Sequence, residues 1–165
     1  MNAIALIGLS GSGKSTVGPL LAERLGLPHL DVDLVLEQRE GRTIREIFDT
    51  DGEPYFRALE REITIELLAA PGVLSLGGGA PMTRAIADAL EGHPVVWLRV
   101  EPESSARRIG RDEGRPLLAG QDAVVRLRRM LSERAPTYAR LASLAVDTDH
   151  ASVDSVVDAI AAHVA

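Results

Sequence analysis

A phosphate-binding loop constrains this chain more than any other feature of its sequence. Residues 4–16 read IALIGLSGSGKST, and they contain the pattern G-x-x-x-x-G-K-[ST] between Gly8 and Ser15. The apolar run before the pattern predicts a buried strand over 3–7, and the stretch after it predicts a helix over 16–25. Strand, loop and helix in that order are the context that the pattern requires, which disfavours an ordinary glycine-rich turn. The sequence therefore predicts an α/β protein with a nucleotide site.

The backbone and the side chains of this loop have different tasks. Glycines allow positive φ angles, so that successive N–H groups converge on a phosphate at a helix N-terminus. Lys14 can then reach the outer phosphates, and the Ser15 hydroxyl can ligate Mg²⁺. Lys14 is the only lysine in the chain, beside seventeen arginines. The residues expected to contact ATP here are Gly11, Ser12, Gly13, Lys14, Ser15 and Thr16.

The composition fits a globular chain and excludes several classes of protein. It has 165 residues, 45% of them hydrophobic, which suits a single domain over 1–165. A net charge of −6 and 3% aromatic residues argue against a nucleic-acid partner. No apolar run reaches the length of a membrane span, so no membrane partner is expected. The chain has no cysteine, and its first apolar stretch enters the loop directly, so we expect a cytoplasmic protein.

Strand and helix patterns alternate along the rest of the chain, which predicts a parallel sheet with helices on both faces. Further strands are expected at 29–32, 73–76, 94–100 and 144–146. Further helices are expected at 34–70 with breaks at Gly41 and Gly52, and at 82–90, 101–110, 121–134 and 153–164. The helix over 121–134 is expected to stop before Pro136. The polar stretch 111–120 shows no periodicity and is interpreted as a loop.

Several protein classes share the phosphate loop, and the sequence separates some of them. A GTP-binding switch needs an Asn-Lys-x-Asp contact to guanine, but Asn2 is the only asparagine and Lys14 the only lysine. Motor and transporter ATPases normally use longer chains. A small-molecule or nucleotide kinase remains, which needs an acceptor site, charge to hold the acceptor and a lid that excludes water.

The sequence resembles the shikimate kinase family over almost its whole length. The segments that carry the resemblance are GLSGSGKST (8–16), LDVDLVLEQREGRTIREIFDTDGEPYFRALE (30–60), LSLGGGA (74–80), RPLL (115–118) and ERAPTY (133–138). The resemblance implies a P-loop fold of the nucleoside-monophosphate-kinase type, with a five-stranded parallel sheet flanked by helices. It also implies a helical substrate-binding region at about 31–61 and a lid at about 110–122.

The same resemblance implies the reaction. The γ-phosphoryl group of ATP passes to the 3-hydroxyl of shikimate, with Mg²⁺ as cofactor, and gives ADP and shikimate 3-phosphate for aromatic amino-acid biosynthesis. Asp33 matches the aspartate that binds and deprotonates the acceptor hydroxyl, and Asp31 would sit near Mg²⁺ through a water. Asp33 lies at the carboxyl end of the expected second strand, where open parallel sheets place their ligands. The alternative for either residue is an N-cap of the next helix.

The resemblance makes Arg57 and Arg134 a pair that grips the shikimate carboxylate. A guanidinium group suits this role because its planar fork binds a carboxylate through two hydrogen bonds. From the residues alone, Arg57 could instead pair with Glu53 one turn away, and Arg134 could complement a helix dipole. A glycine run follows the third strand and would bring backbone N–H groups close to the substrate, with the matched position at its centre. The run consists of Gly77, Gly78 and Gly79.

Two arginines complete the expected site. Arg115 matches the lid arginine that stabilises charge at the β–γ bridge of ATP, and Arg108 is the candidate to stack on adenine. The family often has a basic residue after the last strand, whereas this chain has Asp149-His150-Ala151 there. Two other functions stay open, namely a sugar-acid kinase such as a gluconate kinase, and a nucleotide-binding module without catalysis. We expect a monomer.

Overall fold

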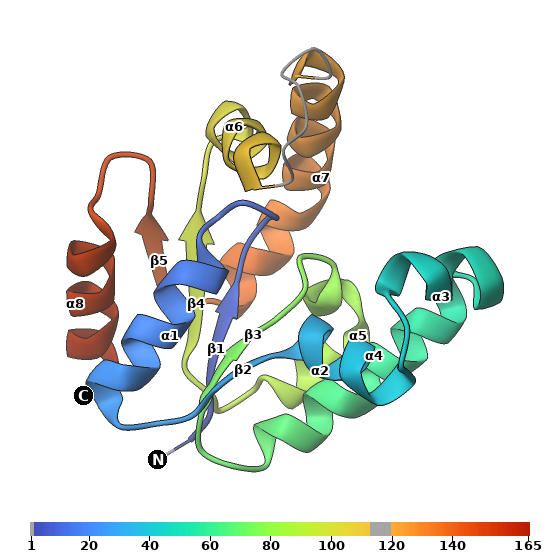
Figure 1. Cartoon of the computed structure of the whole chain (residues 1–165). Helices are drawn as coiled ribbons and strands as arrows, with labels where there is room; N and C mark the ends of the chain where they lie inside the picture. The colour runs from blue at the N-terminus through green and yellow to red at the C-terminus, as the bar shows by residue number, and fades with distance from the viewer. Residues whose placement is uncertain (1, 113–119) are drawn as a thin grey trace.

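The predicted parallel sheet is present in the computed structural model, which describes residues 2–112 and 120–165. All pairings are parallel and the strand order is β2-β3-β1-β4-β5. Figure 1 shows the sheet between two layers of helices. The strands are β1 (Ile4–Ile7), β2 (His29–Asp31), β3 (Val73–Ser75), β4 (Val95–Arg99) and β5 (Leu144–Asp147). The prediction of the fold class is confirmed.

Helices connect every pair of successive strands. Gly41 and Gly52 end two of them, as predicted, and Thr43 begins the helix between by exchanging hydrogen bonds with Glu46 in a capping box. The helices are α1 (Lys14–Leu25), α2 (Val32–Glu40), α3 (Ile44–Asp51), α4 (Glu53–Leu68), the 3₁₀ turn η1 (Ala80–Met82), α5 (Arg84–Ala89), α6 (Pro102–Asp112), α7 (Gly120–Leu141) and α8 (Val153–Val164).

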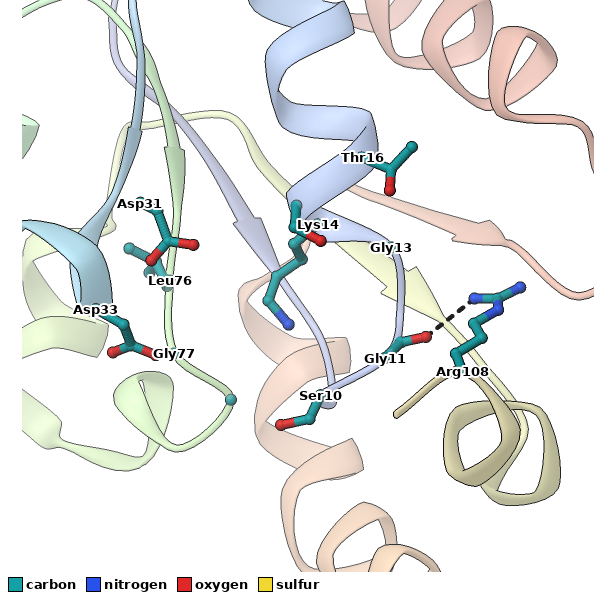
Figure 2. Close-up of a pocket in the computed structure, with 12 residues that line it drawn as sticks. Ser10, Gly11, Gly13, Lys14, Thr16, Asp31, Asp33, Leu76, Gly77 and Arg108 are labelled. Carbon is teal, nitrogen blue, oxygen red and sulfur yellow. Dashed lines mark hydrogen bonds between the residues drawn. The ribbon is translucent and has the colours of Figure 1, made fainter. Parts of the chain in front are cut away.

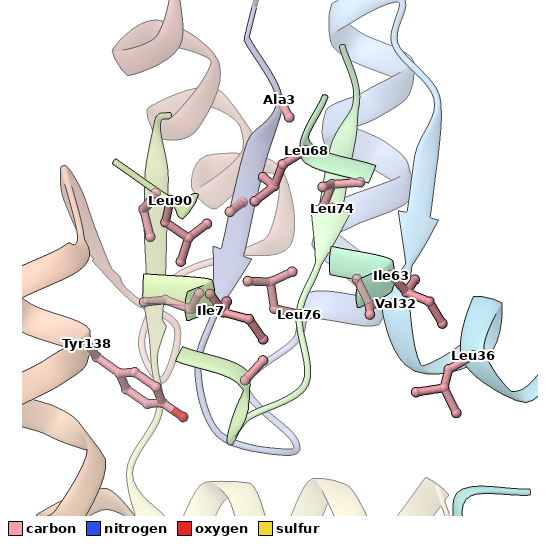
Figure 3. Close-up of a cluster of buried hydrophobic side chains, with 14 of the residues drawn as sticks. Ala3, Ile7, Val32, Leu36, Ile63, Leu68, Leu74, Leu76, Leu90 and Tyr138 are labelled. Atoms are coloured by element: carbon pink, nitrogen blue, oxygen red, sulfur yellow. The ribbon is translucent and has the colours of Figure 1, made fainter. Parts of the chain in front are cut away.

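The sheet separates two hydrophobic cores. Side chains alternate between the faces of β1, so Ile4 and Leu6 enter one core and Ala5 and Ile7 enter the other. The first core is formed with α1 and α8. The second, shown in Figure 3, is formed with α2, α3, α4, α5 and α7. Because β1 is buried on both faces, it has the continuous apolar sequence that a central parallel strand needs.

The end of α7 differs from the prediction. A helix stopping before Pro136 is wrong, because α7 continues through this proline to Leu141. Proline removes one hydrogen bond of the helix, at a cost of about 3 kcal/mol. Two residues later the side chain of Tyr138 is completely buried against Trp97, with ring centroids 5.6 Å apart. Burial of an aromatic ring stabilises by a similar amount, so tertiary packing outweighs the local signal.

The register of the sheet brings three sequence motifs to one edge. Ser75 pairs with Leu6 of β1 on one side and with Asp31 of β2 on the other. The phosphate loop, the aspartates and the glycine run therefore all leave the carboxyl edge of the sheet, where α/β proteins bind ligands. Among the described residues, no helix combines the length and the apolar character needed to cross a membrane.

Candidate active site

A cavity of about 520 Å³ opens at this edge of the sheet. It lies between the phosphate loop and the start of α2, and Figure 2 shows the Lys14 side chain pointing into the space between them. The lining residues are Ser10, Gly11, Gly13, Lys14, Ser15, Thr16, Asp31, Asp33, Leu76, Gly77, Gly78 and Arg108. Nucleotide-binding and acceptor-binding candidates thus share one cavity.

The phosphate loop has the backbone that the pattern predicts. Gly11 and Gly13 have φ angles of 76° and 100°, and Gly13 is the N-cap of α1. A β-carbon on Gly11 would lie 2.9 Å from the carbonyl oxygen of Ser105, so α6 also leaves no room for a side chain there. The buried Ser105 hydroxyl donates to the carbonyl oxygen of Ser10. Helix α6 therefore supports the loop from behind, a role that the sequence did not reveal.

Lys14 lies folded against its own loop. Its Nζ donates to the carbonyl oxygens of Gly8 at 2.7 Å and Leu9 at 2.9 Å, and to the Ser12 hydroxyl at 3.3 Å. Burial lowers the pKa of Lys14 to about 8, against the attraction of Asp33 and Asp31. The ammonium group is still mainly protonated at pH 7, and it borders the cavity, where it can attract a phosphate.

The two aspartates have different environments. Asp31 is the N-cap of α2, where its carboxylate accepts from the backbone N–H of Leu34 at 3.2 Å, so the capping alternative holds for this residue. Asp33 lies in the first turn, and its Oδ1 is buried without a hydrogen-bond partner among the described residues. Burial raises the pKa of Asp33 to about 6, and the charges of Asp31 and Glu60 add to the effect. Asp33 is therefore a carboxylate with an unused acceptor and a basicity near neutral pH.

The guanidinium group of Arg57 is held by the carboxylate of Glu60, which is not among the site residues predicted from the sequence. Its Nη1 donates to Oε1 of Glu60 at 2.8 Å, whereas the expected contact with Glu53 is longer, at 3.4 Å. The Glu60 side chain is only 1% exposed, and burial raises its pKa while Arg57 and Arg134 lower it. The pair could have been predicted from the sequence, because Arg57 and Glu60 are three residues apart on one helix and such residues are neighbours on its surface.

The three glycines leave space for functional side chains. None of them has a positive φ angle, so conformational freedom does not explain the run. A β-carbon on Gly77 would lie 3.1 Å from both Asp33 Oδ1 and Glu60 Oε2. A β-carbon on Gly78 would lie 2.8 Å from Arg134 Nη1, and one on Gly79 would lie 2.6 Å from Arg57 Nη2. Arg57 and Arg134 thus stand behind the glycines, outside the residues that line the cavity.

Gly79→Ala tests this arrangement. The φ and ψ angles of Gly79, −89° and −9°, are open to alanine, so the backbone need not change. The new methyl group must displace the Arg57 guanidinium, and we expect the KM for the acceptor to rise about tenfold while the KM for ATP stays the same. Steady-state kinetics with each substrate varied in turn measures both constants. An unchanged acceptor KM would contradict the placement of Arg57.

Arg108, the candidate to contact adenine, forms hydrogen bonds with the phosphate loop and with the segment that follows β5. Its Nη1 donates to the Gly11 carbonyl oxygen at 3.1 Å and to the Thr148 hydroxyl at 3.2 Å, and its Nη2 donates to the Thr148 carbonyl oxygen at 3.0 Å. It borders both the main cavity and a second one of about 180 Å³. The second cavity is lined by Ser12, Gly13, Thr16, Val17, Arg108, Thr148, Ala151, Val153 and Val156. His150 is exposed and is not among them.

One expected site residue lies outside the described residues. Arg115, and with it most of the lid expected at about 110–122, falls within 113–119. Within the described ranges, no group of three or more histidine, aspartate or glutamate side chains is placed to hold a metal ion. Ser15 and Asp31 nevertheless border the same cavity, an arrangement compatible with Mg²⁺, which is usually bound through few protein groups, waters and substrate phosphates.

Comparisons with known proteins agree with this geometry. A family model described as "Shikimate kinase" matches residues 10–165. The shikimate kinase of Mycobacterium avium (strain 104) is 49% identical over 92% of this chain and 87% of that protein. That of Mycobacterium tuberculosis (strain ATCC 25177 / H37Ra) is 47% identical over the same shares.

Solved structures extend the comparison. Shikimate kinase from Acinetobacter baumannii in complex with shikimate has a TM-score of 0.90 and 34% identity, covering 99% of this chain and 93% of that one. A gluconokinase from Sinorhizobium meliloti 1021 has a TM-score of 0.65 and 23% identity over the same shares, and it shares the fold alone. Because the match to shikimate kinases covers nearly the whole sequence, the chain belongs to the shikimate kinase family.

Proposed function

We propose that this chain transfers the γ-phosphoryl group of ATP to the 3-hydroxyl of shikimate. The observation that carries the proposal is Asp33, which has a buried, unpartnered Oδ1 and lines the same cavity as the phosphate-binding candidate Lys14. Family membership supplies the acceptor, and the glycine run with two guanidinium groups behind it suits a carboxylic acid with several hydroxyls.

The positions of the side chains support the following roles. Asp33 accepts the proton of the 3-hydroxyl as its oxygen bonds to the γ-phosphorus, and the bond from that phosphorus to the β–γ bridging oxygen breaks. Lys14 stabilises the charge on the transferred group, with the loop N–H groups around it. Ser15, and Asp31 through a water, are proposed to hold Mg²⁺, which neutralises phosphate charge when bound.

The remaining roles concern binding. Arg57 and Arg134 are proposed to hold the shikimate carboxylate, and the backbone of the glycine run to contact its hydroxyls. The second cavity, beside Arg108, is proposed to receive adenine. Arg115 is proposed to act from the lid at the β–γ bridge. The chain is proposed to form one kinase domain over 1–165, with the acceptor region at about 31–61.

The deciding experiment measures ADP release from Mg-ATP with shikimate, gluconate or a nucleoside monophosphate as the acceptor. We expect release that depends strongly on shikimate. Release with gluconate or a nucleoside monophosphate instead would keep the kinase chemistry but overturn the assignment of the acceptor site. ATP binding without release in any mixture would leave a nucleotide-binding module.

A further inference from the structure

Tyr138 is a buried polar side chain that the proposed reaction does not use. Its side chain is completely buried, and its hydroxyl donates to the carbonyl oxygen of Gly78. Figure 3 shows its ring reaching from α7 toward the carboxyl end of β1. Contact with Trp97 explains the ring but not the hydroxyl, because phenylalanine would pack there equally well. The hydroxyl therefore indicates a requirement at Gly78.

Gly78 is the central residue of the segment 77–79, which packs against the side chains proposed to bind the acceptor. The carbonyl oxygen of Gly8 lies 3.3 Å from the β-carbon position of Gly78, and Arg134 Nη1 lies 2.8 Å from it. The phosphate loop and Arg134, one of the two arginines proposed to bind the carboxylate, thus both lie close to this glycine. A displacement of Gly78 would change the gap between the site of the phosphates and the site of the acceptor.

Tyr138 and Arg134 are four residues apart in α7, so they lie on the same side of the helix. One helix therefore positions both the guanidinium group and the glycine segment that it touches. The peptide between Gly78 and Gly79 is trans, so fixing the Gly78 carbonyl toward α7 directs the N–H of Gly79 the opposite way. Three successive glycines give this segment many accessible backbone conformations, and ordering them costs entropy. The hydrogen bond from Tyr138 to the central glycine restricts the segment to one of these conformations.

We propose that Tyr138 is a positioning residue for the acceptor. Through its hydrogen bond to Gly78 it fixes the segment 77–79 relative to Arg134 and the phosphate loop, and so prearranges the site for shikimate. This inference rests on the function proposed above. It assigns to Tyr138 an effect on the acceptor and none on the nucleotide.

The test compares Tyr138→Phe with Tyr55→Phe, which removes the only other tyrosine hydroxyl of the chain. Although Tyr55 lies within 31–61, it borders neither cavity, and its hydroxyl donates to Glu40 on the protein surface at 3.1 Å, so the loss of this hydroxyl should leave all kinetic constants unchanged. For Tyr138→Phe we expect the KM for shikimate to rise about tenfold and the KM for ATP to stay within about twofold. ADP release at varied shikimate and at varied ATP gives these constants.

A double-mutant cycle separates positioning from a general structural effect. If Tyr138 positions the acceptor through Gly78 and Arg134, both of which its hydroxyl approaches, then Tyr138→Phe should have a much smaller effect on the shikimate KM in an Arg134→Ala background. Additive effects would overturn the proposal. So would a parallel rise of both KM values, or a Tyr138→Phe protein that does not fold as judged by the fluorescence of Trp97, the only tryptophan. Absence of shikimate-dependent release by the wild-type protein would instead overturn the proposed function.

Discussion

Asp33→Asn is expected to lower kcat by a factor on the order of 10²–10³ while ATP binding survives. Asparagine can still accept a hydrogen bond from the acceptor hydroxyl, but it cannot take the proton. The wild-type protein should lose kcat/KM for shikimate as the pH falls through about 6, the pKa of Asp33, because the protonated carboxyl has no base function. This acid limb should be absent from the pH profile of the variant. A kcat within about threefold of the wild type would contradict the role of base.

Asp31→Asn is the matched control, because asparagine caps a helix as well as aspartate does. Removal of the Asp31 charge takes away one of the causes that raise the pKa of Asp33, so the acid limb should move to lower pH rather than vanish. The proposed water-mediated contact further predicts that this variant needs more Mg²⁺ for half-maximal rate. An Asp31→Asn profile identical to the wild type would contradict the electrostatic coupling of the two carboxylates.

The stability of Asp33→Asn shows whether the fold is intact. The pKa of Asp33, about 6 in the folded protein against 3.8 as its ordinary value, means that ionisation lowers the free energy of unfolding as the pH rises through about 6. At pH 8 the neutral amide avoids this penalty, on the order of 3 kcal/mol, and Tm should rise by about 9 °C. At pH 4 both proteins carry an uncharged group there, and the difference should disappear. Thermal unfolding at the two pH values measures this.

Lys14→Met is expected to lower kcat/KM for ATP by about 10³-fold, because the site loses its preorganised cation for the outer phosphates. Lys14→Arg should recover little of this activity although it keeps the charge. The ammonium group lies within 2.7–3.3 Å of three oxygens of its own loop, and a planar guanidinium group does not fit that compact position. Activity should also fall as the pH rises through about 8, since burial lowers the pKa of Lys14 to that value.

Arg39→Lys is the reciprocal control for the lysine variants. Arg39 forms an exposed ion pair with Glu66, borders neither cavity and has no role in the proposed reaction, so an exchange of cations there should leave kcat and both KM values unchanged. A Lys14→Arg protein with most of the wild-type activity would show that charge alone suffices at position 14. Initial rates at varied ATP, together with direct nucleotide binding, distinguish a defect of binding from one of catalysis.

The elements whose signals are local could be predicted from the sequence. Alternating apolar runs and glycines at helix ends gave the order of strands and helices, and Gly41 and Gly52 end their helices as expected. The end of α7 could not be predicted, because Pro136 acts locally whereas the burial of Tyr138 depends on β4 and on the glycine run. Long-range packing decides such cases.

The candidate site divides in the same way. Loop residues follow from a contiguous pattern, and the structure brings Lys14, Asp31 and Asp33 to one cavity. Glu60 resembles a solvent-facing charge on a helix, and only the absence of a side chain on Gly77, seventeen positions further along, shows why a carboxylate fits there. Thr148 contacts Arg108 because it directly follows β5, and this contact depends on the arrangement of the sheet. Neither Glu60 nor Thr148 could be assigned to the site from the sequence, because Glu60 is distant along the chain from Gly77, and Thr148 from Arg108.

The two cores on opposite faces of the sheet have an evolutionary consequence. The helices that carry Asp33, Arg57 and Arg134 belong to one core, whereas α1, which carries Ser15 and Thr16, belongs to the other. Selection can therefore remodel the helices around a new hydroxyl acid while the packing beneath the triphosphate stays as it is. Changes confined to the core that those helices form would alter the acceptor site and leave the contacts to ATP in place.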